Sequence, residues 1–417
     1  MQRLVIEGEK KLTGELVCHG AKNAALPLLA GCVLAKGETV LHNCPRLSDV
    51  FAACRILSCL GCECKRENDS VLVNTDGLLH FDVPDDLMRE MRSSIVFLGA
   101  ILGRLGKCKL SFPGGCELGP RPIDMHISAL KKMGVQINEE HGVLDCSVPN
   151  GLTGANITFS FPSVGATENV ILAAATAKGT TIIHNAAREP EIADLASFLN
   201  RCGARISSAG ESTIVIEGVK ELKGCEYTVM PDRIVTATYM SAAALTGGEL
   251  NITNVRTSDI EAVIPVFEQM GCSIYTYNDN IYINARHGLK AVKTIRTMPY
   301  PGFPTDAQAT TMAALCKAHG TSVIVENIFE SRYRQVDELV RMGAKIKTEG
   351  KVAIIDGVKR LYGASVRATD LRGGAALVIL ALAAEGKTEI SDIHLIDRGY
   401  EMIEKSLSSV GASIKRI

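Results

Sequence analysis

Two kinds of hydrophobic pattern alternate along this chain in a fixed order. Stretches rich in small apolar residues, such as residues 24–35, 166–177 and 307–318, predict helices that are buried on most sides. Paired short segments in which apolar and polar residues alternate, such as residues 214–218 and 222–224, predict two strands joined by a turn. The order of helix, strand, second helix and strand pair then recurs, which predicts an α/β fold built from copies of one unit.

Two sets of glycines mark six copies of this unit. One set precedes the first strand of each copy, at Gly37, Gly106, Gly179, Gly247, Gly320 and Gly386. The other follows the second helix, at Gly61, Gly134, Gly203, Gly271, Gly343 and Gly411. A glycine just after a helix suits the left-handed backbone of the C′ position. Self-similarity at a nearly fixed period of about 70 residues indicates repeated structural units.

The N-terminus carries only the last part of this unit. Residues 4–8 and 12–14 reproduce the strand pair without a preceding helix, and the sixth copy ends at Ile417, where its strand pair should begin. We therefore expect residues 1–21 to complete the sixth copy, in a closed arrangement rather than a linear solenoid. The expected domains are residues 22–229, and residues 1–21 with 230–417, with an active site in the cleft between them.

Charged and polar residues recur where the predicted helices begin. The first helices open at Lys22-Asn23, Arg92-Ser93, Ser163-Val164-Gly165, Arg233, Asp306 and Arg372. An arginine precedes every second helix, at Arg46, Arg121, Arg188, Arg256, Arg332 and Arg398. Helix N-termini attract anions, and a guanidinium group binds phosphate or carboxylate through two hydrogen bonds. The pattern predicts a site for a small, multiply charged anion or a diphosphate, with Arg46 and Arg256 the first candidates for purely structural roles.

Two local segments add chemistry to this pattern. Residues 113–122, PGGCELGPRP, form a glycine-rich segment that could act as a lid, and Arg121 would favour the thiolate form of Cys116. Asp306 follows Pro304-Thr305 at a predicted helix start, where an aspartate commonly caps the helix but could also act as a general base. Neither a Walker A motif nor a G-x-G-x-x-G after a strand is present, which disfavours ATP and NAD.

Composition narrows the class of protein further. The chain has 45 Lys and Arg against 46 Asp and Glu, with no charge run that would favour nucleic acid. No apolar run is long enough to cross a bilayer, and the N-terminus resembles no signal peptide, so we expect a cytoplasmic protein that does not bind membranes. The 14 cysteines are expected to be reduced thiols, and no metal or cofactor is expected.

Six segments, in this order, resemble the UDP-N-acetylglucosamine enolpyruvyltransferase family: GAKNAALP, PGGCELGPRPID, SVGAT, AAREPEI, GFPTD and HLIDRGYE. The resemblance covers the whole chain. It implies a two-domain inside-out α/β barrel with three repeats per domain, acting as a monomer. It also implies transfer of the enolpyruvyl group of phosphoenolpyruvate to the 3′-hydroxyl of UDP-N-acetylglucosamine, with release of phosphate. That reaction is the first committed step of peptidoglycan synthesis, on which cell shape and cell division depend.

The resemblance implies roles for five residues that would bind phosphoenolpyruvate. Lys22, Arg121 and Arg398 would hold mainly its phosphate, and Lys22 would count among the catalytic residues. Arg332 and Arg372 would place its carboxylate.

Further roles implied by the resemblance concern the sugar nucleotide and proton transfer. Asp306 would take the proton from the 3′-hydroxyl, and Cys116 would act as proton donor or as a covalent phospholactoyl carrier. Asn23 would contact the sugar, and Arg92 would support Arg121 and the anionic substrates. The UDP site would be lined by Pro122, Ile123, Asp124, Met125, Ser163, Val164, Gly165 and Ile328.

Two departures and two alternatives accompany this interpretation. Pro120 stands where members of the family often have a small residue, and Phe161-Pro162 stands where some have a lysine near the uracil. The sister enolpyruvyltransferases that use shikimate 3-phosphate share the fold, but the Cys116 segment and SVGAT argue against them. A sugar-nucleotide sensor with a decayed site is disfavoured because Lys22, Cys116, Asp306 and Arg398 are all present.

Cys116 is expected to react fastest of the cysteines with fosfomycin, an epoxide mimic of phosphoenolpyruvate to which the resemblance implies susceptibility. Arg121 should favour the thiolate and attract the phosphonate, and UDP-N-acetylglucosamine should speed the reaction by closing the lid. Mass spectrometry after brief exposure, with and without the sugar nucleotide, locates the adduct. Labelling spread over several cysteines would contradict this assignment. A Cys116→Asp variant should resist the epoxide and keep some turnover.

Overall fold

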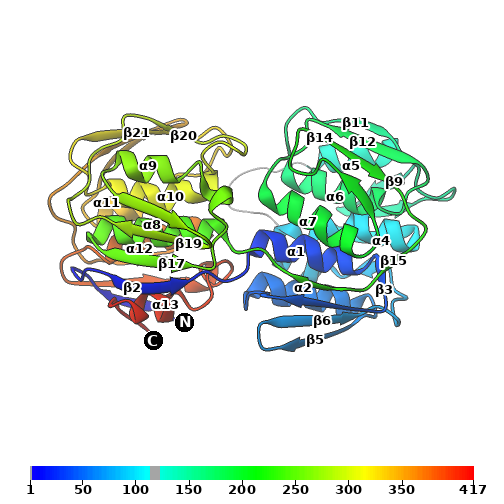
Figure 1. Cartoon of the computed structure of the whole chain (residues 1–417), viewed down its shortest axis with the longest axis horizontal. Coiled ribbons are helices and arrows are strands. Elements are labelled where there is room, and N and C mark those ends of the chain that lie inside the picture. Colours follow the sequence, from blue (N-terminus) through cyan, green and yellow to red (C-terminus); the bar gives the residue numbers. More distant parts are fainter. Residues whose placement is uncertain (1, 113–122) are drawn as a thin grey trace. The chain divides into compact units, whose positions relative to one another are not determined.

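The structure, a computed structural model, describes residues 2–112 and 123–417, whose contacts divide them into two compact units (Figure 1). The terminal unit holds residues 2–19 and 231–417, and the central unit holds residues 20–112 and 123–230. Cys116, Arg121 and Pro122 lie outside the described residues, and so does the side chain of Arg92.

Three helices pack against one another in the core of the terminal unit. These core helices are α8 (Arg233–Thr246), α10 (Thr305–Leu315) and α12 (Leu371–Ala381). In α10 every residue from Ala307 to Leu315 is buried, including Gln308, Thr310 and Thr311. The small residues that predicted these helices allow this burial on all sides, so the alanine-rich pattern is explained by packing inside the unit.

Three four-stranded sheets of the terminal unit share one strand order, in which a parallel edge strand is followed by three antiparallel strands. The first sheet has the order β2 (Thr13–Val17), β17 (Glu249–Thr253), β19 (Asn280–Asn284) and β18 (Ser273–Tyr277). The second has β20 (Ile295–Arg296), β21 (Thr321–Val325), β23 (Val352–Asp356) and β22 (Lys345–Glu349). The third has β24 (Ser365–Arg367), β25 (Lys387–Ser391), β1 (Leu4–Glu7) and β26 (Ser413–Arg416).

The N-terminal strands complete two of these sheets. Strand β1 lies between β25 and β26, where Leu4 pairs with Ile390 on one side and with Arg416 on the other. Strand β2 pairs in parallel with β17, as the neighbouring blue and green strands in Figure 1 show. Strand β1 therefore completes the sixth copy, as the repeat pattern predicts. Strand β2 was expected beside it in the same strand pair, but it joins the sheet of the fourth copy instead.

The central unit repeats the same plan. Its core helices are α1 (Lys22–Cys32), α4 (Phe97–Leu105) and α6 (Val164–Ala174). Its four-stranded sheets have the orders β16-β4-β6-β5, β7-β8-β10-β9 and β11-β12-β14-β13. Their strands are β16 (Glu226–Thr228), β4 (Glu38–His42), β6 (Ser70–Asn74), β5 (Glu63–Glu67), β7 (Asp82–Val83), β8 (Lys107–Ser111), β10 (Val143–Ser147), β9 (Gln136–Glu140), β11 (Asn156–Thr158), β12 (Thr180–His184), β14 (Thr213–Glu217) and β13 (Arg205–Ser207). A short pair, β3 (Ala35–Lys36) and β15 (Leu222–Lys223), links its first and third copies.

The second helices vary in length between copies. In the central unit they are α2 (Ser48–Cys59), α5 (Asp124–Lys132) and α7 (Pro190–Arg201), with an additional α3 (Asp85–Glu90). In the terminal unit they shorten to α9 (Ile264–Gln269), α11 (Val336–Arg341) and α13 (Ile403–Ser409). Turns and the short 3₁₀ helices η2 (Thr257–Ile260) and η3 (Ile393–Leu395) occupy the positions before these shortened helices. Some of the arginines expected just before a second helix therefore lie several residues ahead of it.

The core helix of the second copy begins differently from the prediction. It was expected to open at Arg92-Ser93, but this segment is the 3₁₀ helix η1 (Arg92–Val96), and α4 starts only at Phe97. The side chain of Asn169 from α6 explains the difference. Its amide accepts from the Gly99 N–H at 2.6 Å and donates to the Ile95 carbonyl at 2.9 Å, so it replaces the helical hydrogen bond between those two residues.

Both sets of repeat glycines have positive φ in all six copies, as expected for residues after helices and before strands. A third set follows a strand and lies against the turn that comes after the core helix of the same copy. A Cβ at Gly357 would lie 1.6 Å from the Ala318 carbonyl oxygen, and a Cβ at Gly218 would lie 1.7 Å from that of Ala177. These positions require glycine because backbone approaches backbone.

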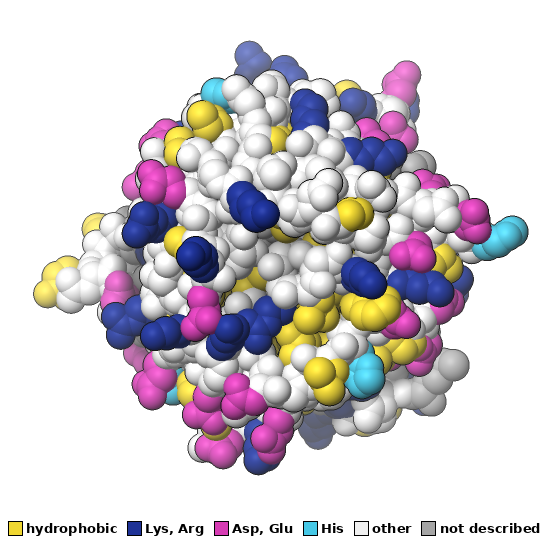
Figure 2. Space-filling view, turned by 90° about the vertical axis from the view of Figure 1, so that its right-hand side faces the viewer, with side chains coloured by type: hydrophobic (Ala, Val, Ile, Leu, Met, Phe, Trp, Pro, Cys, Tyr) yellow, Lys and Arg dark blue, Asp and Glu magenta, His cyan; other side chains and the backbone are white. Residues whose placement is uncertain are grey.

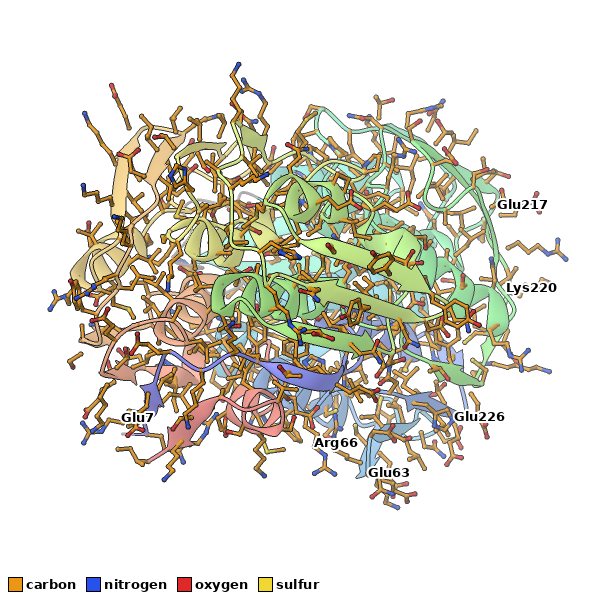
Figure 3. All side chains as sticks on the ribbon, turned by 60° about the vertical axis from the view of Figure 1, so that its left-hand side comes forward. Glu7, Glu63, Arg66, Glu217, Lys220 and Glu226 are labelled. Atoms are coloured by element: carbon orange, nitrogen blue, oxygen red, sulfur yellow. The ribbon has the colours of Figure 1, made fainter. Side chains whose placement is uncertain are left out.

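Side chains of opposite charge are interspersed on the face drawn in Figure 2, in line with the near-zero net charge. Glu63, Glu217, Lys220 and Glu226 are exposed, and Figure 3 shows them at the periphery of the ribbon.

Within the described part of the chain, no helix combines the length and the apolar character needed to cross a membrane.

Gly357→Ala is expected to destabilise the terminal unit by about 1–3 kcal/mol, since the added methyl group would overlap the Ala318 carbonyl oxygen. The midpoint of urea unfolding measures this change. Gly350→Asn is the matched control, because Gly350 has φ +54° and no atom within 4 Å of the position of a Cβ. Asparagine tolerates that backbone conformation. Equal midpoints for the two variants would contradict the close approach.

Candidate active site

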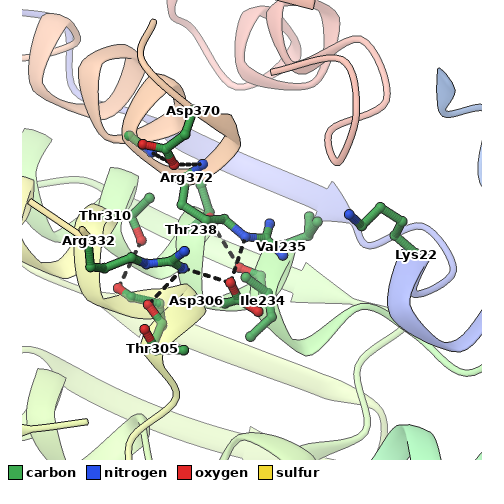
Figure 4. Close-up of polar contacts among 12 residues, drawn as sticks. Lys22, Ile234, Val235, Thr238, Thr305, Asp306, Thr310, Arg332, Asp370 and Arg372 are labelled. Carbon is green, nitrogen blue, oxygen red and sulfur yellow. Dashed lines mark hydrogen bonds and ion pairs between the residues drawn. The ribbon is translucent and has the colours of Figure 1, made fainter. Parts of the chain in front are cut away.

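Asp306, the second residue of α10, lies between two arginines (Figure 4). Arg332 Nη2 is 2.7 Å from Asp306 Oδ1, and Arg372 Nε is 3.3 Å from the same oxygen. The side chains of Arg332 and Arg372 are only 2% and 5% exposed, whereas that of Asp306 is 30% exposed. Two guanidinium groups share one carboxylate, so these three side chains carry a net positive charge and suit a further anion.

Backbone and ring contacts fix the two arginines. Arg332 Nη2 also donates to the Thr305 carbonyl at 3.0 Å, and its guanidinium lies 5.6 Å from the centre of the Phe329 ring. Arg372 Nη1 donates to the Tyr400 hydroxyl at 3.4 Å. Burial acts to lower the pKa of Arg372, but Asp306 and Tyr400 outweigh it and raise that pKa overall. Arg372 therefore remains charged in spite of its burial.

The helix that carries Arg372 begins with a capping carboxylate. Asp370 Oδ1 accepts from the backbone N–H groups of Arg372 and Gly373, both at 3.0 Å. This is the contact of an aspartate N-cap, which fixes the first turn of α12. Asp370 lies two residues before Arg372, a sequence signal that could have identified it.

In the central unit, Lys22 opens α1 and pairs with Asp49 from the first turn of α2. Lys22 Nζ lies 3.2 Å from Asp49 Oδ2, and the two side chains are 12% and 3% exposed. The neighbouring Asn23 is partly buried. Asp49 was not among the sequence candidates, although it lies only three residues after Arg46. Nothing in the sequence pattern links it to Lys22, which lies 27 positions earlier at the start of α1.

The starts of α5 and α6 bring several predicted sugar-nucleotide residues together. Ser163 caps α6 by accepting from the Ala166 N–H at 3.4 Å, and a Cβ at Gly165 would lie 3.2 Å from His126 Cε1 of α5. Ile123 and Asp124 line a surface pocket beside α5. Met125 and Val164 are both partly buried. The close approach at Gly165 explains why residues 123–125 and 163–165 lie near one another.

Several of the repeat arginines have structural partners. Arg46 donates to the Asn68 carbonyl at 3.1 Å, and Arg256 lies 3.7 Å from Asp259, in line with the structural roles expected for both. Arg188 also donates to a backbone carbonyl, that of Gly210 at 3.2 Å. Arg398 is partly buried after η3. The predictions for Cys116, Arg121 and Pro122, and for the side chain of Arg92, fall outside what the structure describes.

An acidic cluster lies beside the start of α6. Glu168 of α6 is 6% exposed, and Glu191 of α7 is 3% exposed. Burial raises the pKa of Glu168 well above its usual range, and the neighbouring Glu191 and Glu189 raise it further. The sequence pattern gave no sign of this cluster, because its members come from different helices.

No metal-binding group and no disulfide bond occurs among the described residues. In residues 2–112 and 123–417, no three His, Cys, Asp or Glu side chains form a group that could hold a metal ion. The 13 cysteines within that part of the chain are free thiols, and burial raises the pKa of Cys316 to about 12. Such a buried thiol is a poor nucleophile.

Comparison with known proteins shows similarity along the whole chain. The family model of EPSP synthase (3-phosphoshikimate 1-carboxyvinyltransferase) matches residues 6–407. The chain is 50% identical to UDP-N-acetylglucosamine 1-carboxyvinyltransferase 2 of Caldanaerobacter subterraneus, with all of both chains covered. It is 48% identical to UDP-N-acetylglucosamine 1-carboxyvinyltransferase 1 of Symbiobacterium thermophilum, covering 100% of this chain and 95% of that protein.

Solved structures support the fold independently. The enolpyruvyl transferase NikO from Streptomyces tendae superimposes with a TM-score of 0.88 at 23% identity, over 100% of this chain and 98% of the other. EPSP synthase from Acinetobacter baumannii gives a TM-score of 0.79 at 20% identity over the whole of both chains. The expected two-domain α/β architecture is therefore confirmed.

Glu168→Gln is expected to stabilise the protein increasingly as pH rises. A raised carboxyl pKa in the folded state contributes stability below the unfolded value of about 4.3, and this contribution is lost as pH rises through the folded value. The glutamine variant lacks that loss, so its gain in unfolding midpoint over the parent chain should be larger at pH 8 than at pH 5. Glu217→Gln, at an exposed strand end, serves as the control. A gain that is the same at both pH values would contradict the raised pKa.

Proposed function

We propose that this chain transfers the enolpyruvyl group of phosphoenolpyruvate to the 3′-hydroxyl of UDP-N-acetylglucosamine and releases phosphate. The chain belongs to the EPSP synthase family, and it is 50% identical to a UDP-N-acetylglucosamine 1-carboxyvinyltransferase. The reaction is the first committed step of peptidoglycan synthesis. The observation that carries the proposal is the partly exposed carboxylate of Asp306, which lies at the start of α10 between two buried arginines.

The arrangement suits the addition step of this reaction. The 3′-hydroxyl oxygen forms a bond to C2 of phosphoenolpyruvate, its proton passes to Asp306, and C3 gains a proton, for which Cys116 is the proposed donor. The product is a tetrahedral ketal that still carries the phosphate. Arg332 and Arg372 would hold the carboxylate of phosphoenolpyruvate through charge-assisted hydrogen bonds.

Elimination then breaks the bond between C2 and the phosphate oxygen, while C3 loses a proton to restore the double bond. Lys22, Arg121 and Arg398 are the proposed partners of the departing phosphate. Lys22 is supported by its ion pair with the buried Asp49, which holds the ammonium group at the start of α1. Fixed cations stabilise charge that the leaving group gains in the transition state.

The ion pairs of Asp306 suggest how substrate binding activates the base. In the structure the guanidinium groups of Arg332 and Arg372 both contact its carboxylate. The carboxylate of phosphoenolpyruvate would compete for the same donors and free Asp306 to accept the hydroxyl proton. Binding and activation would thus be one event.

The sugar nucleotide is proposed to bind a set of residues from the helix starts and the Ile328 loop: Asn23, Pro122, Ile123, Asp124, Met125, Ser163, Val164, Gly165 and Ile328. Arg92 is proposed to support Arg121 and the anionic substrates. The start of α6 offers its free N–H groups and helix dipole to the diphosphate. The proposed contacts come from both units, which we take as domains of residues 22–229 and of residues 1–21 with 230–417. We further propose a cytoplasmic, monomeric enzyme that needs neither metal nor cofactor.

Phosphate release from phosphoenolpyruvate tests this function directly. We expect release with UDP-N-acetylglucosamine as acceptor and none with shikimate 3-phosphate. Release with shikimate 3-phosphate alone would assign the chain to the sister activity, and binding of the sugar nucleotide without release would indicate a sensor.

Asp306→Asn is expected to lower turnover by about 10²–10⁴-fold, because the amide cannot accept the hydroxyl proton. Both substrates should still bind, which calorimetry can measure. The control is Asp356→Asn, at the exposed end of β23. The Asp356 carboxylate accepts from the Thr321 hydroxyl at 2.6 Å, and its replacement should leave turnover unchanged. Near-normal turnover of Asp306→Asn would return Asp306 to a structural role.

A further inference from the structure

Glu326 is a buried carboxylate to which the proposed reaction assigns no role. It follows β21 directly and is 1% exposed. Its Oε1 accepts from Thr297 Oγ1 at 2.9 Å, from the Ile328 N–H at 2.8 Å and from the Phe329 N–H at 3.1 Å. Its Oε2 accepts from Thr305 Oγ1 at 2.9 Å. Both oxygens are therefore engaged inside the terminal unit.

The partners of Glu326 fit a group that accepts on both oxygens. The two backbone groups can only donate, and the Thr297 hydroxyl, which accepts from the Asn327 N–H at 2.9 Å, also lies against Oε1. A carboxylate offers acceptor sites on both oxygens, so it can satisfy all four contacts. The buried carboxyl group is thus held on both sides within the terminal unit.

The partners of Glu326 adjoin three residues proposed for the site. Thr305 is the first residue of α10 and directly precedes Asp306. The Ile328 N–H belongs to a residue proposed to contact the sugar nucleotide. Phe329 presents its ring to the guanidinium of Arg332, which in turn donates to the Thr305 carbonyl. One carboxylate thereby connects the helix start of Asp306 with the loop that carries Ile328 and Arg332.

We propose that Glu326 is a positioning residue that sets the geometry of Asp306 through Thr305, and that it holds the Ile328 loop in register with that base. This inference rests on the proposed function. Replacing a buried charge and its partners by apolar groups of the same shape is often neutral or stabilising, so stability alone does not account for such a group. A positioning role does account for Glu326, because it would fix Asp306 and the Ile328 loop relative to each other. Misplacement of a catalytic group by about 1 Å can cost 10²-fold in rate.

The Thr305 hydroxyl is the link that can be cut with least disturbance. Thr305→Val keeps the shape of the side chain and removes only its hydrogen bond to Glu326. We expect kcat for phosphate release to fall about 10- to 100-fold, while KM for both substrates changes less than about threefold. Thr305→Ser retains the hydroxyl and should restore most of kcat.

Thr310→Ala is the matched control. Thr310 is fully buried on the same helix, and its hydroxyl donates to the Ala307 carbonyl at 3.3 Å within α10. This variant should lose thermal stability but keep kcat. If Thr305→Val does not fold, Glu326→Gln, which keeps the shape and removes the charge, is measured instead and should show the same fall in kcat with KM retained.

The outcomes separate this proposal from the function on which it rests. An unmodified chain that releases no phosphate would overturn the proposed function. An active unmodified chain with unchanged kcat in Thr305→Val, or a fall in kcat that Thr305→Ser does not reverse, would overturn the positioning role alone. A fall in kcat of equal size in Thr310→Ala would also overturn it, since general loss of stability would then explain the effect.

Discussion

The carboxylate of Asp306 lies against two guanidinium groups that are almost completely buried, and this contact requires three separate segments to meet. Arg332 comes from the loop after β21, Arg372 from the first turn of α12, and Asp306 from the first turn of α10. A buried charge without a partner would be strongly destabilising, so the starts of these elements must lie close together. The tight packing of α10 and α12, through alanines and the paired glycines of α12, makes that approach possible.

The repeated architecture explains why charge gathers at these points. Each copy begins a core helix after a parallel edge strand, and the three copies of a unit share one sheet order. Helix starts therefore recur at equivalent places, where free N–H groups and arginines favour anions. The residue at each start differs between copies: Lys22 in one, Ser163 in another, and Asp306 or Arg372 in others.

Sequence reasoning succeeded where the signal is local and repeated. Residues that recur in every copy predicted three features correctly. These are the positive φ at both glycine sets, the starts of α1 and α8, and the place of β1 in the sheet of the sixth copy. It did not identify Asp49, Asn169 or Glu326, because their roles come from partners far along the chain: Asn169 bonds to Gly99 across 70 positions. A single polar residue inside an apolar helix does not reveal which backbone group it will contact. The same limit explains why η1 was expected to be a regular helix start.

In the proposed mechanism, substrate binding draws the two arginines away from Asp306 and so prepares it as the base. A crystal structure with UDP-N-acetylglucosamine and a non-reactive analogue of phosphoenolpyruvate tests it most directly, through the distance between Asp306 Oδ1 and Arg332 Nη2. We expect this distance to grow from 2.7 Å to beyond hydrogen-bonding range. The carboxylate of the analogue should then contact both guanidinium groups, and Asp306 should lie within reach of the 3′-hydroxyl. An unchanged ion pair, with the hydroxyl bound elsewhere, would contradict it.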